Sequence, residues 1–107
     1  MTRIETNSDF VTLINLFTVD QSKQKILVDM LIEATEQIMK KQEDFISANI
    51  HRSLDGTAVV NYSRWKSKDV FGKMLNNLQA QIYIIHMNDI LNIAGSDGRL
   101  HEVVFTE

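Results

Sequence analysis

The sequence predicts an α+β fold of the ferredoxin-like type, with elements in the order β-α-β-β-α-(α)-β and helices on one face of an antiparallel sheet. Three observations lead to this class. Short runs of β-branched and aromatic residues alternate with segments of helical periodicity. The dipeptide Asp55-Gly56 separates two adjacent strand segments, as in a hairpin. The 107 residues, 44% apolar and 23% charged, suit one globular domain, so we expect a single domain over 1–107 with a polar segment at 1–9.

The first two elements are a strand and a helix. Residues 10–19 are a short apolar run rich in β-branched and aromatic side chains, which predicts a strand buried on both faces. Asp20 then offers a side-chain acceptor to the first turn of a helix. Apolar residues recur at helical spacing over 21–41: Ile26, Leu27, Met30, Leu31, Ala34 and Ile38.

A hairpin follows, with strands over 44–54 and 57–65. The dipeptide between them tolerates the positive φ angles that tight hairpin turns demand. Pairing outward from it gives these opposite residues: Leu54 and Thr57, Arg52 and Val59, Ile50 and Asn61, Ala48 and Ser63, Ile46 and Trp65. Because side chains alternate along a strand, these residues share one face.

The last third of the chain is expected to hold one or two helices and a strand. Ser67 is placed to cap a helix whose apolar positions are Val70, Phe71, Met74, Leu75 and Leu78. Residues 79–94 suit either strand or helix, and we favour helix. Residues 95–98 contain two of the four glycines and predict a turn, and 100–106 predict the last strand.

The composition excludes several classes of protein. There is no cysteine, which excludes disulfides, thiolate metal sites and cysteine nucleophiles. A net charge of −3 without a cluster of basic residues argues against nucleic acid as a partner. No apolar run approaches the ~20 residues of a membrane helix, so we expect no membrane partner and a cytoplasmic location.

The hairpin carries the candidate site. One of its faces is mostly apolar and should lie under the helices, whereas the other is polar. Asn61 and Trp65 lie on the apolar face, roughly 13 Å apart at ~3.3 Å per residue. The indole donates only and the amide both donates and accepts, which suits an oxygenated aromatic ligand. The alternative is that Trp65 is a core residue and Asn61 is satisfied by backbone groups.

Residues 45–57 (FISANIHRSLDGT) and 59–67 (VVNYSRWKS) resemble the hairpin of antibiotic biosynthesis monooxygenase domains. Residues 13–19 (LINLFTV) and 101–104 (HEVV) are similar to that family too. The resemblance implies a dimeric α/β barrel with a pocket in each subunit between sheet and helices. It also implies oxidation of polycyclic phenols, quinols or related aromatics by dioxygen, with no metal and no flavin. A related branch degrades haem.

In that family, an Asn and a Trp on the third strand are associated with the pocket, and here these fall on Asn61 and Trp65. Both are our candidate catalytic residues, as donors to a developing oxyanion. The remaining wall of the pocket, in contact with the substrate, is predicted to be Ile46, Ala48, Ile50, Val59, Phe71, Met74, Tyr83 and His86.

Three residues are candidates for a general base: His51, His86 and Tyr83. The pairing puts His51 on the face away from Asn61, where a hydrogen bond at an interface is the simpler role. His86 is the only haem ligand to consider, and no motif supports it. A symmetric homodimer through the sheet faces would cover the face without helices. The competing function is a small-molecule binding or dimerisation module without catalysis.

Overall fold

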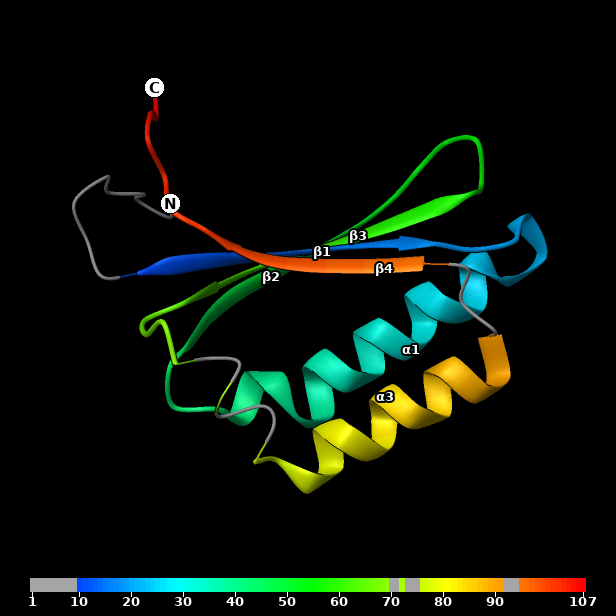
Figure 1. The fold of residues 1–107 in the computed structure, drawn as a ribbon, viewed down its shortest axis with the longest axis horizontal. Coiled ribbons are helices and arrows are strands. Elements are labelled where there is room, and N and C mark those ends of the chain that lie inside the picture. The colour runs from blue at the N-terminus through cyan, green and yellow to red at the C-terminus, as the bar shows by residue number, and fades with distance from the viewer. Residues whose placement is uncertain (1–9, 70–71, 73–75, 92–94) are drawn as a thin grey trace.

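A computed structural model describes residues 10–69, 72, 76–91 and 95–107 (Figure 1). These residues form four strands and two α-helices, with a 3-10 turn before and after the first helix. The bounds are β1 Val11–Thr18, η1 Gln21–Lys23, α1 Gln24–Gln37, η2 Met39–Lys41, β2 Phe45–Arg52, β3 Ala58–Trp65, α3 Leu78–Leu91 and β4 Gly95–His101. None of the helices in these ranges is long and apolar enough to cross a membrane.

The four strands form one antiparallel sheet in the order β2-β3-β1-β4. Both helices lie on the same face of this sheet, and α1 and α3 run side by side beneath it (Figure 1). The other face is not covered by any helix of the described chain. This arrangement confirms the predicted ferredoxin-like α+β class.

The first helix begins differently from the prediction. Asp20 makes no side-chain capping hydrogen bond, and instead its backbone carbonyl accepts from Lys23 N at 2.9 Å in a 3-10 turn. Regular α-helix therefore starts only at Gln24, whose buried side chain faces the hairpin. Its Nε2 donates to the carbonyls of Ser53 and Ala58 at 3.0 and 2.9 Å. Two backbone carbonyls next to the hairpin turn therefore accept hydrogen bonds from α1.

The turn of the hairpin is longer than the sequence suggests. Gly56 has φ +81°, the left-handed conformation that glycine adopts without strain. The expected pairing of Leu54 with Thr57 is wrong, because the ladder ends at the hydrogen bond from Ser53 N to Ala58 O. In place of that pairing, Asp55 Oδ1 accepts hydrogen bonds from the backbone N–H of Thr57 at 3.0 Å and from the Thr57 hydroxyl at 2.7 Å.

A bulge at the start of β2 corrects a second pairing. Ala48 and Ile50 lie opposite Ser63 and Asn61 as expected, but Trp65 pairs with Phe45 rather than with Ile46. The extra residue falls between Phe45 and Ser47, where a bulge lets two residues oppose one. Because of this shift, an aromatic ring stands beside the indole where the pattern placed an isoleucine.

The C-terminal elements agree in part. The helix favoured over 79–94 is α3, whereas most of the helix expected after Ser67, with Phe71 and Met74, lies outside the described residues. The turn expected at 95–98 is wrong, and the last strand lies earlier than the expected 100–106, because β4 is Gly95–His101. This edge strand is held by its ladder to β1, and backbone hydrogen bonds do not require apolar side chains.

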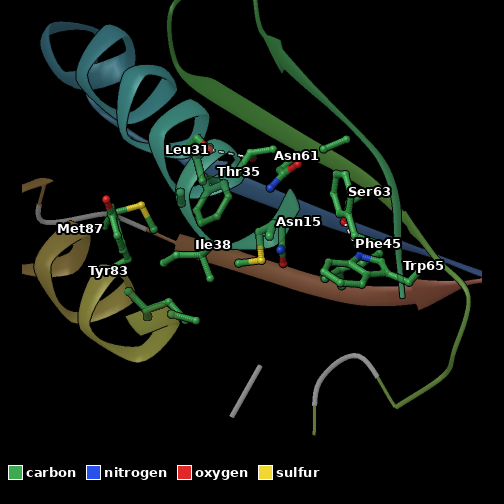
Figure 2. Close-up of a pocket in the computed structure, with 17 residues that line it drawn as sticks. Asn15, Leu31, Thr35, Ile38, Phe45, Asn61, Ser63, Trp65, Tyr83 and Met87 are labelled. Atoms are coloured by element: carbon green, nitrogen blue, oxygen red, sulfur yellow. Dashed lines mark hydrogen bonds between the residues drawn. The ribbon is translucent and has the colours of Figure 1, made fainter. Parts of the chain in front are cut away.

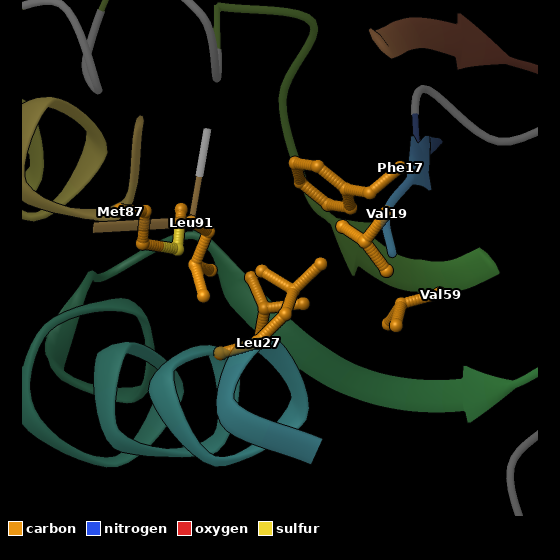
Figure 3. Packing of buried hydrophobic residues seen from close by; sticks show 7 residues of the cluster. Phe17, Val19, Leu27, Val59, Met87 and Leu91 are labelled. Atoms are coloured by element: carbon orange, nitrogen blue, oxygen red, sulfur yellow. The ribbon is translucent and has the colours of Figure 1, made fainter. Parts of the chain in front are cut away.

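The buried apolar side chains form two clusters under the sheet. The larger, seen in Figure 3, joins β1 and β3 to both helices through Phe17, Val19, Leu27, Leu31, Val59, Met87 and Leu91. The smaller lies toward the other end of the same strands and consists of Val11, Leu13 and Trp65, with Met39, Phe45 and Leu100 against it. The core is thus divided along the length of β1 and β3.

Candidate functional site

A cavity of about 90 Å³ lies between the sheet and the two helices. Its wall is mostly apolar and includes residues of both core clusters. The described wall contains no Asp, Glu, Lys, Arg or His side chain, so the site suits an uncharged ligand. Its side chains with a polar group are Asn15, Thr35, Asn61, Ser63, Trp65 and Tyr83 (Figure 2).

Asn61 lies in the middle of β3 and faces this cavity. The carboxamide oxygen Oδ1 is buried and has no hydrogen-bond partner. A buried acceptor without a donor is costly, and native structures contain few of them. An O–H or N–H from outside the protein, of a ligand or of a water molecule, would satisfy this oxygen.

Trp65 is 2% exposed and forms one end of the cavity. Its indole N–H donates to Ser63 Oγ at 2.9 Å, and its ring packs edge-on against Phe45, with centroids 5.4 Å apart. The donor expected to bind a substrate oxygen is thus engaged by Ser63. A hydroxyl that accepts one hydrogen bond still has a proton to donate, so Ser63 can present that proton to the cavity.

The predicted substrate-contacting residues fall into three groups. Ala48 and Tyr83 line the cavity. Three others are not part of the described wall. Val59 lies in the larger core cluster with Ile50 packed against it, and the bulge places Ile46 out of register with Trp65. Phe71 and Met74 lie outside the described residues.

The three candidates for a general base are separated by the fold. His51 is exposed on β2 opposite Val60, on the face away from the helices. His86 is exposed and lines a shallow groove between α1 and α3 with Glu33 and Tyr83. Of the three, only Tyr83 reaches the cavity.

Tyr83 itself holds its proton at neutral pH. Its hydroxyl donates to Glu33 Oε1 at 2.9 Å. This hydrogen bond to a carboxylate raises the pKa of Tyr83 above its ordinary value of 10.0. The phenol therefore stays protonated near pH 7, as a donor toward Glu33.

Three polar residues of the wall were missed by the sequence analysis: Asn15, Ser63 and Thr35, whose hydroxyl donates to the Leu31 carbonyl within α1. Asn15 is the one polar side chain between the apolar positions Leu13 and Phe17 on the inner face of β1. A period-two reading of that strand would have singled it out, but the run was interpreted as buried on both faces. Ser63 was paired correctly with Ala48, yet nothing in the sequence linked it to the indole.

The wall offers no site for a metal ion in the part of the chain that is described. No group of three or more His, Cys, Asp or Glu side chains gathers anywhere among those residues. The polar groups of the cavity are neutral amides and hydroxyls, which bind organic oxygen functions by hydrogen bonds.

Comparison with solved structures supports the fold. SnoaB, a cofactor-independent oxygenase from Streptomyces nogalater, superposes with a TM-score of 0.74 at 20% identity, over 92% of this chain and 97% of that one. A protein from Shewanella oneidensis gives a TM-score of 0.77 at 13% identity, over 92% and 95% of the two chains. At these identities the likeness concerns the fold alone.

Sequence comparison identifies the family. The chain is 40% identical over 74 residues to tetracenomycin-F1 monooxygenase of Streptomyces glaucescens. The match covers 69% of this chain and 66% of that protein, a little under two thirds of its length. The family model described as antibiotic biosynthesis monooxygenase matches residues 10–81, which include β1 to β3 and the start of α3. The chain therefore belongs to the antibiotic biosynthesis monooxygenase family.

Proposed function

We propose that the protein is a monooxygenase that oxidises a phenol, quinol or related aromatic with dioxygen and without a cofactor. The observation that carries this proposal is the unpaired Oδ1 of Asn61 in an apolar cavity that also contains Trp65. A phenolic O–H would satisfy that oxygen, and the ring would lie against apolar side chains. Family membership and the relative named a monooxygenase support the same reaction class.

The proposed reaction balances without a further reductant. A phenol C–H position becomes a quinone carbonyl: one oxygen atom of dioxygen forms the new C=O, and the other leaves as water with two hydrogens from the substrate. All four electrons that reduce dioxygen come from the aromatic ring. The ring must first become electron-rich by losing a proton, so a donor that stabilises the phenolate would lower the barrier.

In this proposal the carboxamide of Asn61 can donate to that phenolate through Nδ2 once the proton has left. Trp65 was predicted to be a second donor to the substrate. Because its N–H is held by Ser63, we assign the direct contact to the Ser63 hydroxyl, with Trp65 orienting that hydroxyl and closing the end of the cavity. Substrates larger than one ring would require side chains of the wall to move apart, since the cavity is below the ~300 Å³ of pockets for drug-sized ligands.

Oxygen-uptake assays across anthrones, quinols and small phenols test this function. With a substrate that is consumed, Asn61→Ala should lower the rate by about 10²-fold, the usual effect of losing one oxyanion donor. Trp65→Phe should also be impaired. Asn88→Ala is the matched control, because Asn88 is an exposed amide on α3 that does not line the cavity, and it should retain the wild-type rate. Unimpaired Asn61→Ala and Trp65→Phe variants would refute the assignment of the site.

A second candidate function is binding of the same ligands without catalysis. The described wall contains no side chain that is a base at neutral pH, since Tyr83 is a donor with a raised pKa. A binding module needs only the cavity and its neutral polar groups. Saturable binding of a phenol with no oxygen uptake in the same solution would favour this candidate.

We also infer that two copies of the chain associate through the sheet face that no helix covers. Apolar side chains of β1 and β3 are adjacent there, with Leu16 opposite Val60 and Ile14 opposite Tyr62. Leu16 is 44% exposed in the single chain. Burial of this stripe against a second copy would remove it from water.

A further inference from the structure

A row of polar side chains crosses the sheet on the face that no helix covers. In its centre, Arg64 on β3 lies directly opposite Thr12 on β1. At the two edges of the sheet, Ser47 on β2 lies opposite Arg64, and His101 on β4 lies opposite Thr12. The residues next to Arg64 and Thr12 along their strands line the cavity, so alternation turns this polar row to the other face. The row offers hydrogen-bond donors and one positive charge.

The two central members of the polar row are buried without a partner. Arg64 and Thr12 are each 3% exposed. Within the described part of the chain, Arg64 Nε, Arg64 Nη1 and Thr12 Oγ1 have no hydrogen-bond partner. An arginine side chain stays charged in proteins, and a charge held out of water without an acceptor is strongly unfavourable. An acceptor from outside the described residues would satisfy the guanidinium, and a carboxylate would also balance its charge.

The surroundings of the polar row favour a second copy of the chain as the source of that acceptor. The next outward-facing pairs along β1 and β3 are Ile14 with Tyr62 and Leu16 with Val60, so the row borders the apolar stripe of the uncovered face. A second copy that covers the stripe also excludes water from Arg64. A free ion would have to lose its hydration to reach the guanidinium there, whereas a side chain of the covering copy arrives together with the apolar surface.

The chain has a carboxylate without a described partner beside the same row. Glu102 directly follows His101 and is exposed, and no hydrogen bond or ion pair joins its side chain to another described residue. The segment after β4 rises from the sheet on the side away from both helices (Figure 1). Asp97, on the outward face of β4, is already bound to Arg99 at 3.0 Å. Because a two-fold interface brings the same surface of each copy together, a face with a buried cation also has to supply the matching anion.

We propose that the guanidinium of Arg64 binds the carboxylate of Glu102 of the partner subunit, and that the same pair forms a second time by symmetry. This inference rests on the proposed association of two copies and assigns the polar contact that aligns them. The carboxylate accepts from the free N–H groups of Arg64, and the hydroxyl of Thr12 is a further donor beside it. The apolar stripe supplies the buried area. The two ion pairs fix the register of the sheets, because a shifted arrangement leaves buried charges unpaired.

Sedimentation equilibrium over a dilution series measures the dissociation constant of the dimer. Arg64→Met keeps the length of the side chain and removes its charge, so it leaves the carboxylate of the second copy buried without a cation. It should raise the dissociation constant by at least about 100-fold. Arg64→Lys keeps the charge without the planar fork and should raise it by about tenfold or less. Arg52→Met is the matched control, because Arg52 is exposed on β2 and pairs with the core residue Val59, on the other face of the sheet; it should leave the constant unchanged.

Glu102→Gln tests the same pair from its other side, at an exposed position where folding does not depend on the side chain. It should raise the dissociation constant by a similar factor, including in the case that Arg64→Met does not fold. Mixing the two variants then shows whether the contact crosses between copies. In a mixed dimer one site keeps both charges and the other has neither, whereas each variant alone leaves one unpaired charge at every site. Native mass spectrometry of an equimolar mixture, with one variant ¹⁵N-labelled, should show more mixed dimers than random association gives.

The outcomes separate the ion pair from the association itself. A wild-type dimer whose dissociation constant is unaffected by Arg64→Met or Glu102→Gln would overturn the ion pair and leave the association standing. A loss of affinity in both variants without a preference for the mixed dimer would also overturn it, because the acceptor of Arg64 would then belong to the same chain or to an ion from solution. A wild type that is monomeric at all concentrations would refute the association and this inference with it, while oxygen uptake by the cavity is decided by its own assays.

Discussion

Asn15 on β1 lies directly opposite Asn61 on β3, and both carboxamides face the cavity beneath the sheet. The neighbouring inner-face positions of β1 are apolar, with Leu13 and Phe17 on either side of Asn15. A sheet that served only to form a core would have apolar residues in all these positions. The pair therefore places two polar side chains, one of them with a buried unpaired oxygen, at the wall of the cavity.

The unpaired oxygen of Asn61 predicts that this residue lowers the stability of the protein. Replacement by leucine, of similar size, removes a buried acceptor that has no donor. Asn61→Leu should raise the free energy of unfolding by about 1 kcal/mol, measured by urea denaturation. Gln37→Leu, at an exposed position of α1, should change it by less than about 0.5 kcal/mol. A loss of stability in Asn61→Leu would show that the amide is satisfied within the chain.

The hydrogen bond from Trp65 to Ser63 is buried, so its loss should be measurable. Ser63→Ala leaves the indole N–H without an acceptor and should cost about 1–3 kcal/mol of unfolding free energy. In a Trp65→Phe background the same substitution should cost much less, because phenylalanine has no N–H. A double-mutant cycle by chemical denaturation gives the coupling between the two side chains. Additive effects would mean that the hydrogen bond contributes no stability.

Tyr83 should not act as the general base. Its pKa is raised above 10.0 by the hydrogen bond to Glu33, so the phenol holds its proton throughout the neutral range. Tyr83→Phe should keep the rate of oxygen uptake within about threefold between pH 6 and pH 8. A general base contributes about 10²–10⁴-fold, so a loss of that size in Tyr83→Phe would contradict this assignment.

Asp55 in the hairpin turn should make stability depend on pH at the acid end. Hydrogen bonds from Ser53 and Thr57 lower the pKa of Asp55 from its ordinary value of 3.8 to about 2. Because the pKa is lower in the folded protein, its contribution is present above about pH 4 and is lost as the pH falls to about 2. The difference in melting temperature between wild type and Asp55→Asn should therefore shrink between pH 6 and pH 2. A carboxyl titration by NMR with a midpoint near 4 would contradict the prediction.

The proposed homodimer predicts an effect of a charge on the uncovered sheet face. Leu16→Asp should convert the dimer to a monomer in sedimentation velocity, because the aspartate would lie in the buried stripe. Ile82→Asp is a control, since Ile82 is 57% exposed on α3, on the helical side of the sheet, and should leave the dimer intact. A wild type that sediments as a monomer at all concentrations would refute the association.

The elements that follow side-chain periodicity were predictable from sequence. α1 and the hairpin strands were expected within a few residues of their bounds. One face of each element is buried, so its apolar residues recur at the spacing typical of a helix or a strand. The error at β4 has a different origin: Gly95 and Gly98 are typical of turns, but an edge strand paired by its backbone accepts them. The backbone ladder to β1, a segment distant in sequence, therefore outweighed the local turn propensity of these residues.

The site was predictable to the extent that it depends on strand alternation. Asn61 and Trp65 were expected on one face, and both line the cavity. Ile46 was misplaced because a bulge is an irregularity of backbone pairing that alternation cannot reveal. Asn15 was missed because its position beside Asn61 at the cavity depends on the pairing of β1 with β3, which the order of residues in the chain does not reveal.

The position of Trp65 makes the cavity observable in the unmodified protein. It is the only tryptophan in the sequence, so the emission excited at 295 nm comes from the wall of the candidate site alone. A compound that enters and disturbs the contact with Phe45 or the bond to Ser63 should alter the intensity or wavelength of that emission. Libraries of non-fluorescent aromatics can accordingly be screened for occupants of the cavity without a label and before any substrate is known.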